Sequence, residues 1–149
     1  MKIQDIAKSS GVLRIKKVIN NEVVSSYEFT NLITTYGKTH IANALSSVAL
    51  YNPMSQMAIG EGSGQTASDT TLDNETDRQP LTRAQGVGGN ANTVIYTAVM
   101  PEGVATGNIT EAGIFNAAIL GDMMCYTSFT AIVKEVNASL LMEWTITIT

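Results

Sequence analysis

The segment LLMEWTITIT, residues 140–149, carries the pattern that decides the fold. Large apolar side chains recur at every second position, and Leu141, one glutamate and three threonines fill the alternate positions. Successive side chains of a strand point to opposite faces, so this period of two predicts a strand with one buried face. The apolar set is Leu140, Met142, Trp144, Ile146 and Ile148.

Upstream of this strand, several shorter segments have the composition of strands. Runs rich in β-branched and aromatic residues flank Asn20-Asn21-Glu22, which predicts a hairpin from Val12 to Thr30. Further strands are expected at 57–59, 93–100, 109–115 and 123–133. About seven strands in one chain predict a mainly β protein, an antiparallel β-sandwich or jelly-roll-like domain.

One amphipathic helix is expected over residues 36–48. Thr34 or Thr35 can cap its first turn, and its apolar residues recur at the spacing of one helical face: Ile41, Ala44, Leu45 and Val48. A helix of three to four turns has the right length to pack against one face of a sheet.

The domain organisation follows from where these patterns stop. Residues 1–10 form a polar arm, which either frays or docks on a neighbouring subunit, because a terminus is ordered only when something holds it. Residues 11–149 form a single domain. Within it, residues 65–92 are polar and lack periodicity, which predicts a long loop that serves as an interaction surface or is ordered by partners.

Composition limits the possible partners. Only 15% of the residues are charged, against about 25% in an average domain, which suggests that other subunits cover much of the surface. The net charge is −4 and no basic run exceeds Lys16-Lys17, which argues against nucleic acid and anionic membranes as partners. No segment resembles a signal peptide, and the single Cys125 excludes an internal disulfide, so we expect folding in a reducing cytoplasm.

The sequence offers little catalytic chemistry. His40 is the only histidine and belongs to the expected helix, and Cys125 lies in an apolar run, so neither is expected to be catalytic. The acidic residues between positions 69 and 77 lack the spacing of a calcium loop and are better explained as a solvated loop: Asp69, Asp73, Glu75 and Asp77. We therefore expect no enzyme activity, no metal, no cofactor and no small-molecule ligand.

Five short motifs, taken in order, resemble those of phage tail-fibre and tail-collar type proteins. They are Asn31-Leu32-Ile33-Thr34 before a helix led by Gly37, Met57 to Gly62, the Leu72–Glu75–Arg78 spacing, Ile109 to Phe115 with its Glu111, and the closing strands Phe129 to Lys134 and Trp144 to Ile148. The resemblance covers residues 28–149.

The residues in these motifs that we expect to be structural are Glu75, Arg78, Glu111, Gly60 and Gly113. Glu75 and Arg78 are one helical turn apart, so they can pair with each other, or with Glu111 across the fold. Gly60 and Gly113 would permit close backbone approaches that a side chain blocks.

The resemblance implies a bacteriophage virion structural protein that is assembled in the host cytoplasm. In the proteins it resembles, this module precedes a long repetitive shaft, whereas here the chain ends with the module. That favours a tail collar, adaptor or fibre-attachment subunit that contacts copies of itself and other virion proteins. The alternatives are a capsid decoration (cement) protein and a module that binds a host glycan.

Overall fold

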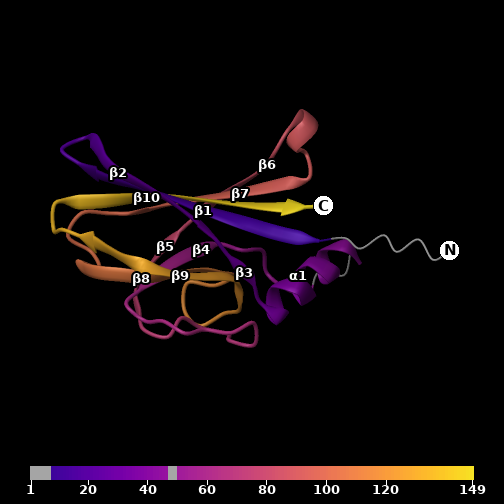
Figure 1. The fold of residues 1–149 in the computed structure, drawn as a ribbon. Coiled ribbons are helices and arrows are strands. Elements are labelled where there is room, and N and C mark those ends of the chain that lie inside the picture. Colours follow the sequence, from indigo (N-terminus) through magenta and orange to yellow (C-terminus); the bar gives the residue numbers. More distant parts are fainter. Residues whose placement is uncertain (1–7, 47–49) are drawn as a thin grey trace.

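The computed structural model describes residues 8–46 and 50–149, which form two antiparallel sheets of five strands packed face to face (Figure 1). Sheet A has the order β2-β1-β10-β7-β6, with bounds β1 Ser9–Ile19, β2 Glu22–Thr30, β6 Thr82–Gln85, β7 Thr93–Met100 and β10 Ala138–Ile148. Sheet B has the order β3-β9-β8-β4-β5, with bounds β3 Leu32–Ile33, β4 Gln56–Gly60, β5 Glu75–Pro80, β8 Gly107–Phe115 and β9 Met123–Lys134. The mainly β sandwich predicted from the sequence is confirmed.

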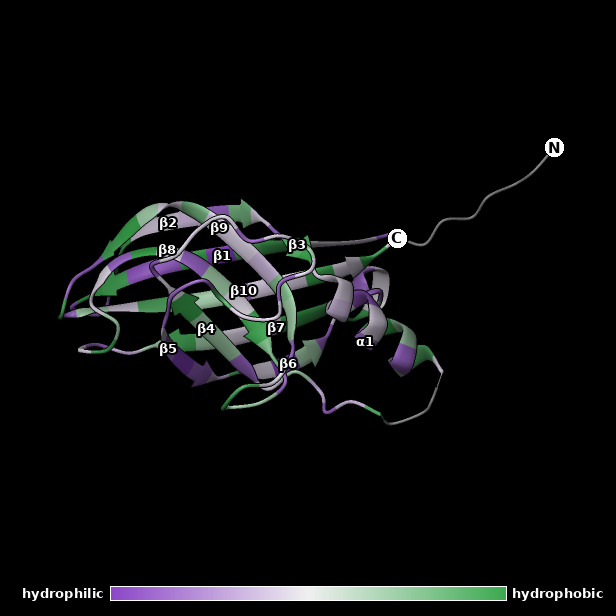
Figure 2. Cartoon of the chain, turned by 90° about the horizontal axis from the view of Figure 1, so that it is seen from below, coloured by the Kyte–Doolittle hydropathy of each residue, from purple (hydrophilic) through white to green (hydrophobic). Residues whose placement is uncertain are grey.

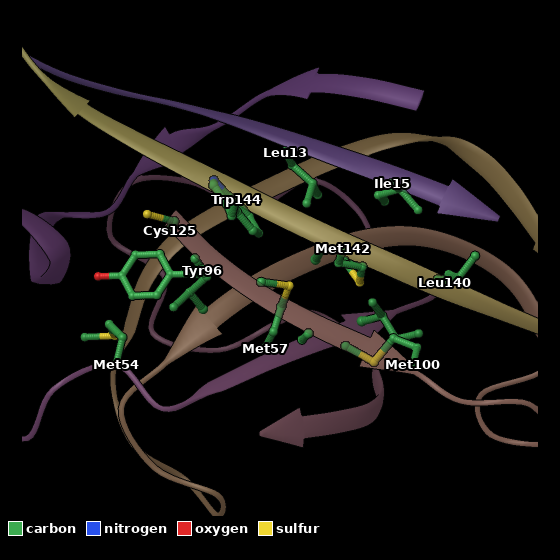
Figure 3. Packing of buried hydrophobic residues seen from close by; sticks show 14 of the residues in the cluster. Leu13, Ile15, Met54, Met57, Tyr96, Met100, Cys125, Leu140, Met142 and Trp144 are labelled. Atoms are coloured by element: carbon green, nitrogen blue, oxygen red, sulfur yellow. The ribbon is translucent and has the colours of Figure 1, made fainter. Parts of the chain in front are cut away.

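Strand β10 lies at the centre of sheet A, between β1 and β7. Trp144 stands between Leu13 of β1 and Tyr96 of β7, and all three side chains are buried (Figure 3). The predicted alternation of β10 is confirmed as far as Ile146, while Ile148 at its end is partly exposed. The same cluster includes Ile114 and Ile132 of sheet B, so the two sheets share one core.

The hairpin expected at the start of the chain is formed by β1 and β2. Its two turn residues, Asn20 and Asn21, have positive φ angles of 52° and 64°, as a tight two-residue turn between twisted strands requires. Strand β1 begins at Ser9, which pairs with Ile148, so the last residues of the expected arm are strand. The rest of that arm, residues 1–7, lies outside the described residues.

The helix α1, Thr35–Leu45, begins where expected but packs differently. The Thr34 side chain accepts a hydrogen bond from the N–H of Gly37 at 2.9 Å and so caps the first turn. Gly37 is the buried residue of the helix. The helix approaches β9 so closely here that a Cβ at Gly37 would overlap the carbonyl oxygen of Met124. Leu45 is 82% exposed, so the expected apolar face is wrong at this position; Val48 lies outside the described residues. The helix lies at one end of the sandwich rather than across a sheet (Figure 1).

The segment 65–92, expected as one loop, contains β5, β6 and a short 3-10 helix, Gly88–Asn90. Both strands lie at an edge of a sheet, with mainly polar side chains, and Figure 2 shows β5 as hydrophilic. A strand that buries neither face has no alternation to detect, which explains the difference from the prediction. Within the described residues, no helix has the length and apolar character needed to cross a bilayer.

Candidate functional site

The outer face of sheet B carries a buried carboxylate, that of Glu111 on β8. Glu111, Gly113 and Phe115 occupy alternate positions of β8, so all three positions lie on this outer face. The loop of residues 61–74, between β4 and β5, crosses the same face (Figure 2). Glu111 is fully buried beneath it.

The carboxylate of Glu111 fixes the 61–74 loop through four hydrogen bonds. Its Oε1 accepts the backbone N–H of Gly62 at 3.0 Å and that of Asn74 at 2.8 Å. Its Oε2 accepts the backbone N–H of Asp73 at 3.1 Å and the side-chain amide of Gln65. Charge-assisted hydrogen bonds of this kind compensate for the lost hydration of a buried carboxylate. We call Glu111 and these four donors the carboxylate clamp.

Two glycines make room for the carboxylate clamp. A Cβ at Gly60 would overlap both the carbonyl oxygen of Asn74 and Oε1 of Glu111. A Cβ at Gly62 would lie 2.7 Å from the same Oε1. Gly113 is less restricted, because its nearest neighbours are mobile side-chain ends, 3.0 Å away at Met123 and 3.1 Å at Leu72 and Phe115.

A small apolar cluster seals the space beside the carboxylate clamp. Leu72 from the loop packs onto outward-facing residues of sheet B, and the cluster comprises Ala58, Leu72, Phe115, Met123 and Tyr126. The hydroxyl of Tyr126 accepts the backbone N–H of Gln65 at 3.2 Å. The 61–74 loop is therefore held by polar and apolar contacts together.

Arg78 on β5 forms the second part of the site. Its guanidinium donates to Glu75 twice, from Nε at 2.8 Å and from Nη2 at 2.7 Å, and lies 3.8 Å from the centre of the Phe115 ring. Residues three apart normally face opposite sides of a strand. In β5, Asp77 pairs with Ile59 and Glu75 pairs with Gly60, and a β-bulge leaves Thr76 between them without a partner on β4. The extra residue turns Glu75 to the same side of the strand as Arg78.

The remaining donor of Arg78 holds the loop of residues 116–122, between β8 and β9. Nη1 donates to the carbonyl oxygen of Ala117 at 2.8 Å and to that of Leu120 at 2.7 Å. Of the two pairings considered from the sequence, the structure brings Arg78 to Glu75, within a strand rather than a helix. It does not bring Arg78 to Glu111, whose hydrogen bonds all go to the neighbouring loop.

The family model for the N-terminal part of phage tail-collar fibre proteins matches residues 26–143. The chain belongs to the phage tail-collar fibre protein family. It is thus a structural component of the phage tail, and the matched range contains all of the carboxylate clamp and the Arg78 contacts. No curated protein and no solved structure matches the chain.

In this tail-collar fibre protein, sequence reasoning selected Glu111, Glu75, Arg78, Gly60 and Gly113 but missed Gly62 and Gln65. The repeated glycine in Gly60-Glu61-Gly62 is the only sequence signal for the former. Gln65 gives no signal, because its role depends on how a loop folds back over a strand.

Among the described residues, the side chains of the other candidate groups of the tail-collar fibre protein form no hydrogen bond with Glu111 or Arg78, and Asp73 contributes to the carboxylate clamp only through its backbone N–H. Cys125 is fully buried, which raises the pKa of its thiol. Burial lowers the pKa of His40, and the charge of Asp122 acts in the opposite direction. Asp69 and Asp73 accept backbone N–H groups of their own loop, from Thr66 and Ser63. Among the described residues, no three acidic, histidine or cysteine side chains are placed to hold a metal ion.

Replacing Arg78 with lysine is expected to lower the free energy of unfolding by about 2 kcal/mol, because lysine keeps the charge but cannot make four directed hydrogen bonds. Urea denaturation measures this loss. Thermolysin should also cleave the 116–122 loop, at Ile119 or Leu120, faster than in the native protein. The matched control is Arg14→Lys, which changes an exposed ion pair with Glu28. Equal protection of the loop in both variants would contradict a holding role for Arg78.

Lys134 provides a test that depends on pH. It is fully buried, and its Nζ donates to the carbonyl oxygens of Pro101 at 2.7 Å and Val104 at 2.8 Å. Burial lowers the pKa of Lys134 below its ordinary value of 10.5. At a pH between the lowered pKa of the folded protein and the ordinary pKa of the unfolded chain, the unfolded chain binds more protons than the folded chain. Lys134 therefore makes the free energy of unfolding rise with pH.

The measurement compares the native protein with Lys134→Met by urea denaturation from neutral to alkaline pH. Subtracting one curve from the other removes the titration of all other groups. We expect the difference, native minus variant, to increase toward alkaline pH. A difference that stays constant would show that Lys134 titrates as an ordinary exposed lysine, and a falling difference would show that folding raises its pKa; either result would contradict the prediction.

Proposed function

We propose that this tail protein is a collar or fibre-attachment subunit that acts as an adaptor, through contacts with copies of itself and with other virion proteins. In this role the subunit performs no enzymatic step and has no nucleic acid, membrane or small-molecule partner. It is assembled in the host cytoplasm and is finally located in the virion. Membership of the tail-collar fibre family supports a location in the phage tail.

The observation that supports the adaptor role is that two charged side chains of sheet B, Glu111 and Arg78, each hold a loop on the same face of the sandwich. Glu111 directs all its hydrogen bonds to the 61–74 loop, and Arg78 holds the 116–122 loop in place. Loops fixed in this way lose little conformational entropy when a partner binds them. Two preorganised loops on one face are what a protein needs to dock on neighbouring subunits.

The composition supports the same role. With 15% charged residues, the surface is poorer in charge than an average domain, which is a property of surfaces buried between subunits. Several large apolar residues are also exposed in the isolated chain, among them Ile119, Leu120 and Val87.

The test is to locate the chain in the particle. Phage carrying an epitope tag on this protein would be purified and labelled with gold-conjugated antibody, and a strain lacking the gene would be imaged beside it. We expect label at the tail, and tails without attached fibres in the deletion strain. Label over the capsid surface would instead identify a decoration protein, and absence of the chain from purified particles would overturn the proposal.

A complementation experiment connects the site to this role. The deletion strain would be supplied with the native gene or with one encoding Arg78→Lys, and fibre attachment would be counted on electron micrographs. Arg14→Lys serves as the matched control. We expect fewer attached fibres only with Arg78→Lys, and equal attachment with both variants would argue against a role for the 116–122 loop in docking.

A further inference from the structure

Strand β2 forms one edge of sheet A, and within the described residues it pairs only with β1. Figure 2 shows β2 along the upper margin of the molecule. The other edge strands are shorter, with two residues in β3, four in β6 and six in β5. Natural proteins protect sheet edges from pairing with short strands, lysine or proline. β2 has nine residues and neither lysine nor proline, so its edge is open to another strand.

The backbone groups of β2 that face this open edge follow from its pairing with β1. The N–H of Asn31, directly after β2, donates to a carbonyl oxygen of β1 at 3.1 Å, so Asn31 directs its backbone groups toward β1. Hydrogen-bonded positions alternate along an antiparallel pair, and Thr30, Glu28 and Ser26 therefore direct theirs outward. In agreement, the carbonyl oxygen of Thr30 accepts the hydroxyl of Thr127 in β9 at 2.9 Å. Ser26 and Glu28 keep outward backbone groups with which a second strand can pair.

The side chains of β2 also leave apolar surface uncovered. Tyr27 and Phe29 are only partly buried against the core, with their rings stacked 6.3 Å apart, and Phe29 stacks on Phe129 of β9 at 4.4 Å. Val23 and Val24, at the start of the strand, are 54% and 52% exposed. Neighbouring exposed valines and partly exposed aromatic rings on one unpaired edge indicate a surface that another chain covers.

The open edge of β2 is complementary to itself in hydrogen bonding. In an antiparallel pair centred on Tyr27, Ser26 of each copy lies opposite Glu28 of the other, so the positions with outward backbone groups meet. Each of these two pairs exchanges two hydrogen bonds. Tyr27 then lies opposite Tyr27 of the second copy at the two-fold axis, and aromatic residues opposite each other stabilise a strand pair.

The same register is complementary in charge on the outer face of sheet A. Lys16 is exposed and lies beside Ser26 on β1, and it forms no ion pair with any residue in the described ranges 8–46 and 50–149. Across the small Ser26, two strand spacings of about 4.8 Å from Lys16, lies Glu28 of the second copy. Within its own chain, Oε2 of Glu28 accepts Nε of Arg14 at 3.0 Å in an exposed pair, while Oε1 accepts no hydrogen bond from the described residues. The second oxygen is therefore available to Lys16 of the other copy.

These features together favour a second copy over a strand of another protein. The partner must offer two pairs of backbone groups at the right spacing, an aromatic residue at the centre and a carboxylate beside Lys16. β2 itself supplies all three in one strand. A contact through the same surface on both copies needs no second site on the molecule and closes as a dimer.

We infer that β2 pairs antiparallel with β2 of a second copy, with Ser26 opposite Glu28, so that the two A sheets join into one continuous sheet. This inference rests on the proposed function, because it names the surface through which an adaptor would contact a copy of itself. It extends that function by specifying a symmetric contact made mainly by backbone groups.

Proline at position 26 tests the backbone pairing. Ser26→Pro removes the outward N–H without breaking a hydrogen bond to β1, and edge strands tolerate proline at such positions. Sedimentation velocity would compare the native chain with Ser26→Pro and with the matched control Ser26→Ala, which keeps the N–H, after circular dichroism has shown that each is folded. A dimer of Ser26→Pro lacks two N–H donors, so we expect dimerisation to weaken by about tenfold or more, and Ser26→Ala to dimerise like the native chain.

Cysteine variants test the register and do not depend on how well proline is tolerated. Tyr27 lies opposite its own copy in a pair that exchanges no hydrogen bonds, where the Cα atoms are about 4.5 Å apart and a disulfide can form. We expect Tyr27→Cys to give a disulfide-linked dimer under mild oxidation. The matched control is Ser25→Cys, on the same face of β2, which would lie opposite Phe29 of the second copy and should give little dimer. The native Cys125 is fully buried and should not react.

A native chain that remains monomeric at every concentration tested would overturn the inference. So would dimerisation that Ser26→Pro leaves unchanged, or that Ser26→Ala weakens equally. Disulfide-linked dimers of Ser25→Cys without those of Tyr27→Cys would overturn the register. If a monomeric chain still labels the phage tail, the proposed function stands without this contact, and if the label is absent from the tail, the proposed function itself fails.

Discussion

Replacing Glu111 with alanine is expected to lower the free energy of unfolding by about 3–5 kcal/mol, since three backbone N–H groups lose their acceptor and each loss costs about 1–3 kcal/mol when buried. Those groups belong to Gly62, Asp73 and Asn74. The total falls below the simple sum of the losses if the 61–74 loop opens and water reaches the donors. Urea denaturation at neutral pH measures the overall loss.

Hydrogen exchange shows where the loss occurs. In the native protein the amides of Gly62 and Asn74 should exchange slowly, and in Glu111→Ala they should exchange quickly, while the amides of β10 remain protected. Glu111→Gln is expected to lose about half as much stability, because one amide oxygen still accepts two N–H groups and Gln65 can turn its own amide to pair with the new NH₂ group.

The matched control is Glu143→Gln, an exposed glutamate 3.8 Å from Arg14. Its effect should lie within about 0.5 kcal/mol of the native value. Equal effects of Glu111→Ala and Glu143→Gln would show that the carboxylate clamp does not hold the loop.

Replacing Gly60 with alanine is expected to cost about 3 kcal/mol, at the upper end for an overpacked site. The new methyl group would overlap the carbonyl oxygen of Asn74, which is backbone, and Oε1 of Glu111. A flexible side chain moves aside at small cost, but here the 61–74 loop itself must shift. We therefore expect Gly60→Ala to expose the same amides to hydrogen exchange as Glu111→Ala.

Combining the two substitutions gives a stricter test. Because both act on the same contacts, the double variant should lose clearly less stability than the sum of the single losses. Gly89→Ala is the matched control, since nothing lies within 4 Å of its Cβ position, and its effect should be small. Additive losses in the double variant would mean that Gly60 acts independently of Glu111.

The core strands were predictable because they obey a simple period. β10 alternates with one buried face, and the Asn20-Asn21 turn marks the hairpin before it. The edge strands β5 and β6 were not predictable by this rule, since they bury neither face and their sequence consists mainly of polar residues. For the helix, the spacing of apolar residues predicted a buried face that included Leu45, but the side chain of Leu45 faces solvent.

The site was predictable only in its most polar members. A glutamate such as Glu111 within an apolar strand is conspicuous, and Arg78 follows Glu75 at a short spacing. The partners of Glu111 are mainly backbone N–H groups, which every residue carries, so no side-chain pattern identifies them. The bulge at Thr76, which turns Glu75 and Arg78 to one side, is likewise a property of strand pairing and not of residue type.

The position of β10 between β1 and β7 has a consequence for biosynthesis. Leu13 must wait for Trp144, its neighbour in the register, which the ribosome adds 131 residues later. Until then β1 and β2 form at most an isolated hairpin, which is marginally stable by itself. Contacts this distant in sequence slow folding, and the nascent chain would expose unpaired strand edges meanwhile. A chaperone that shields these edges during synthesis would therefore help this subunit to fold.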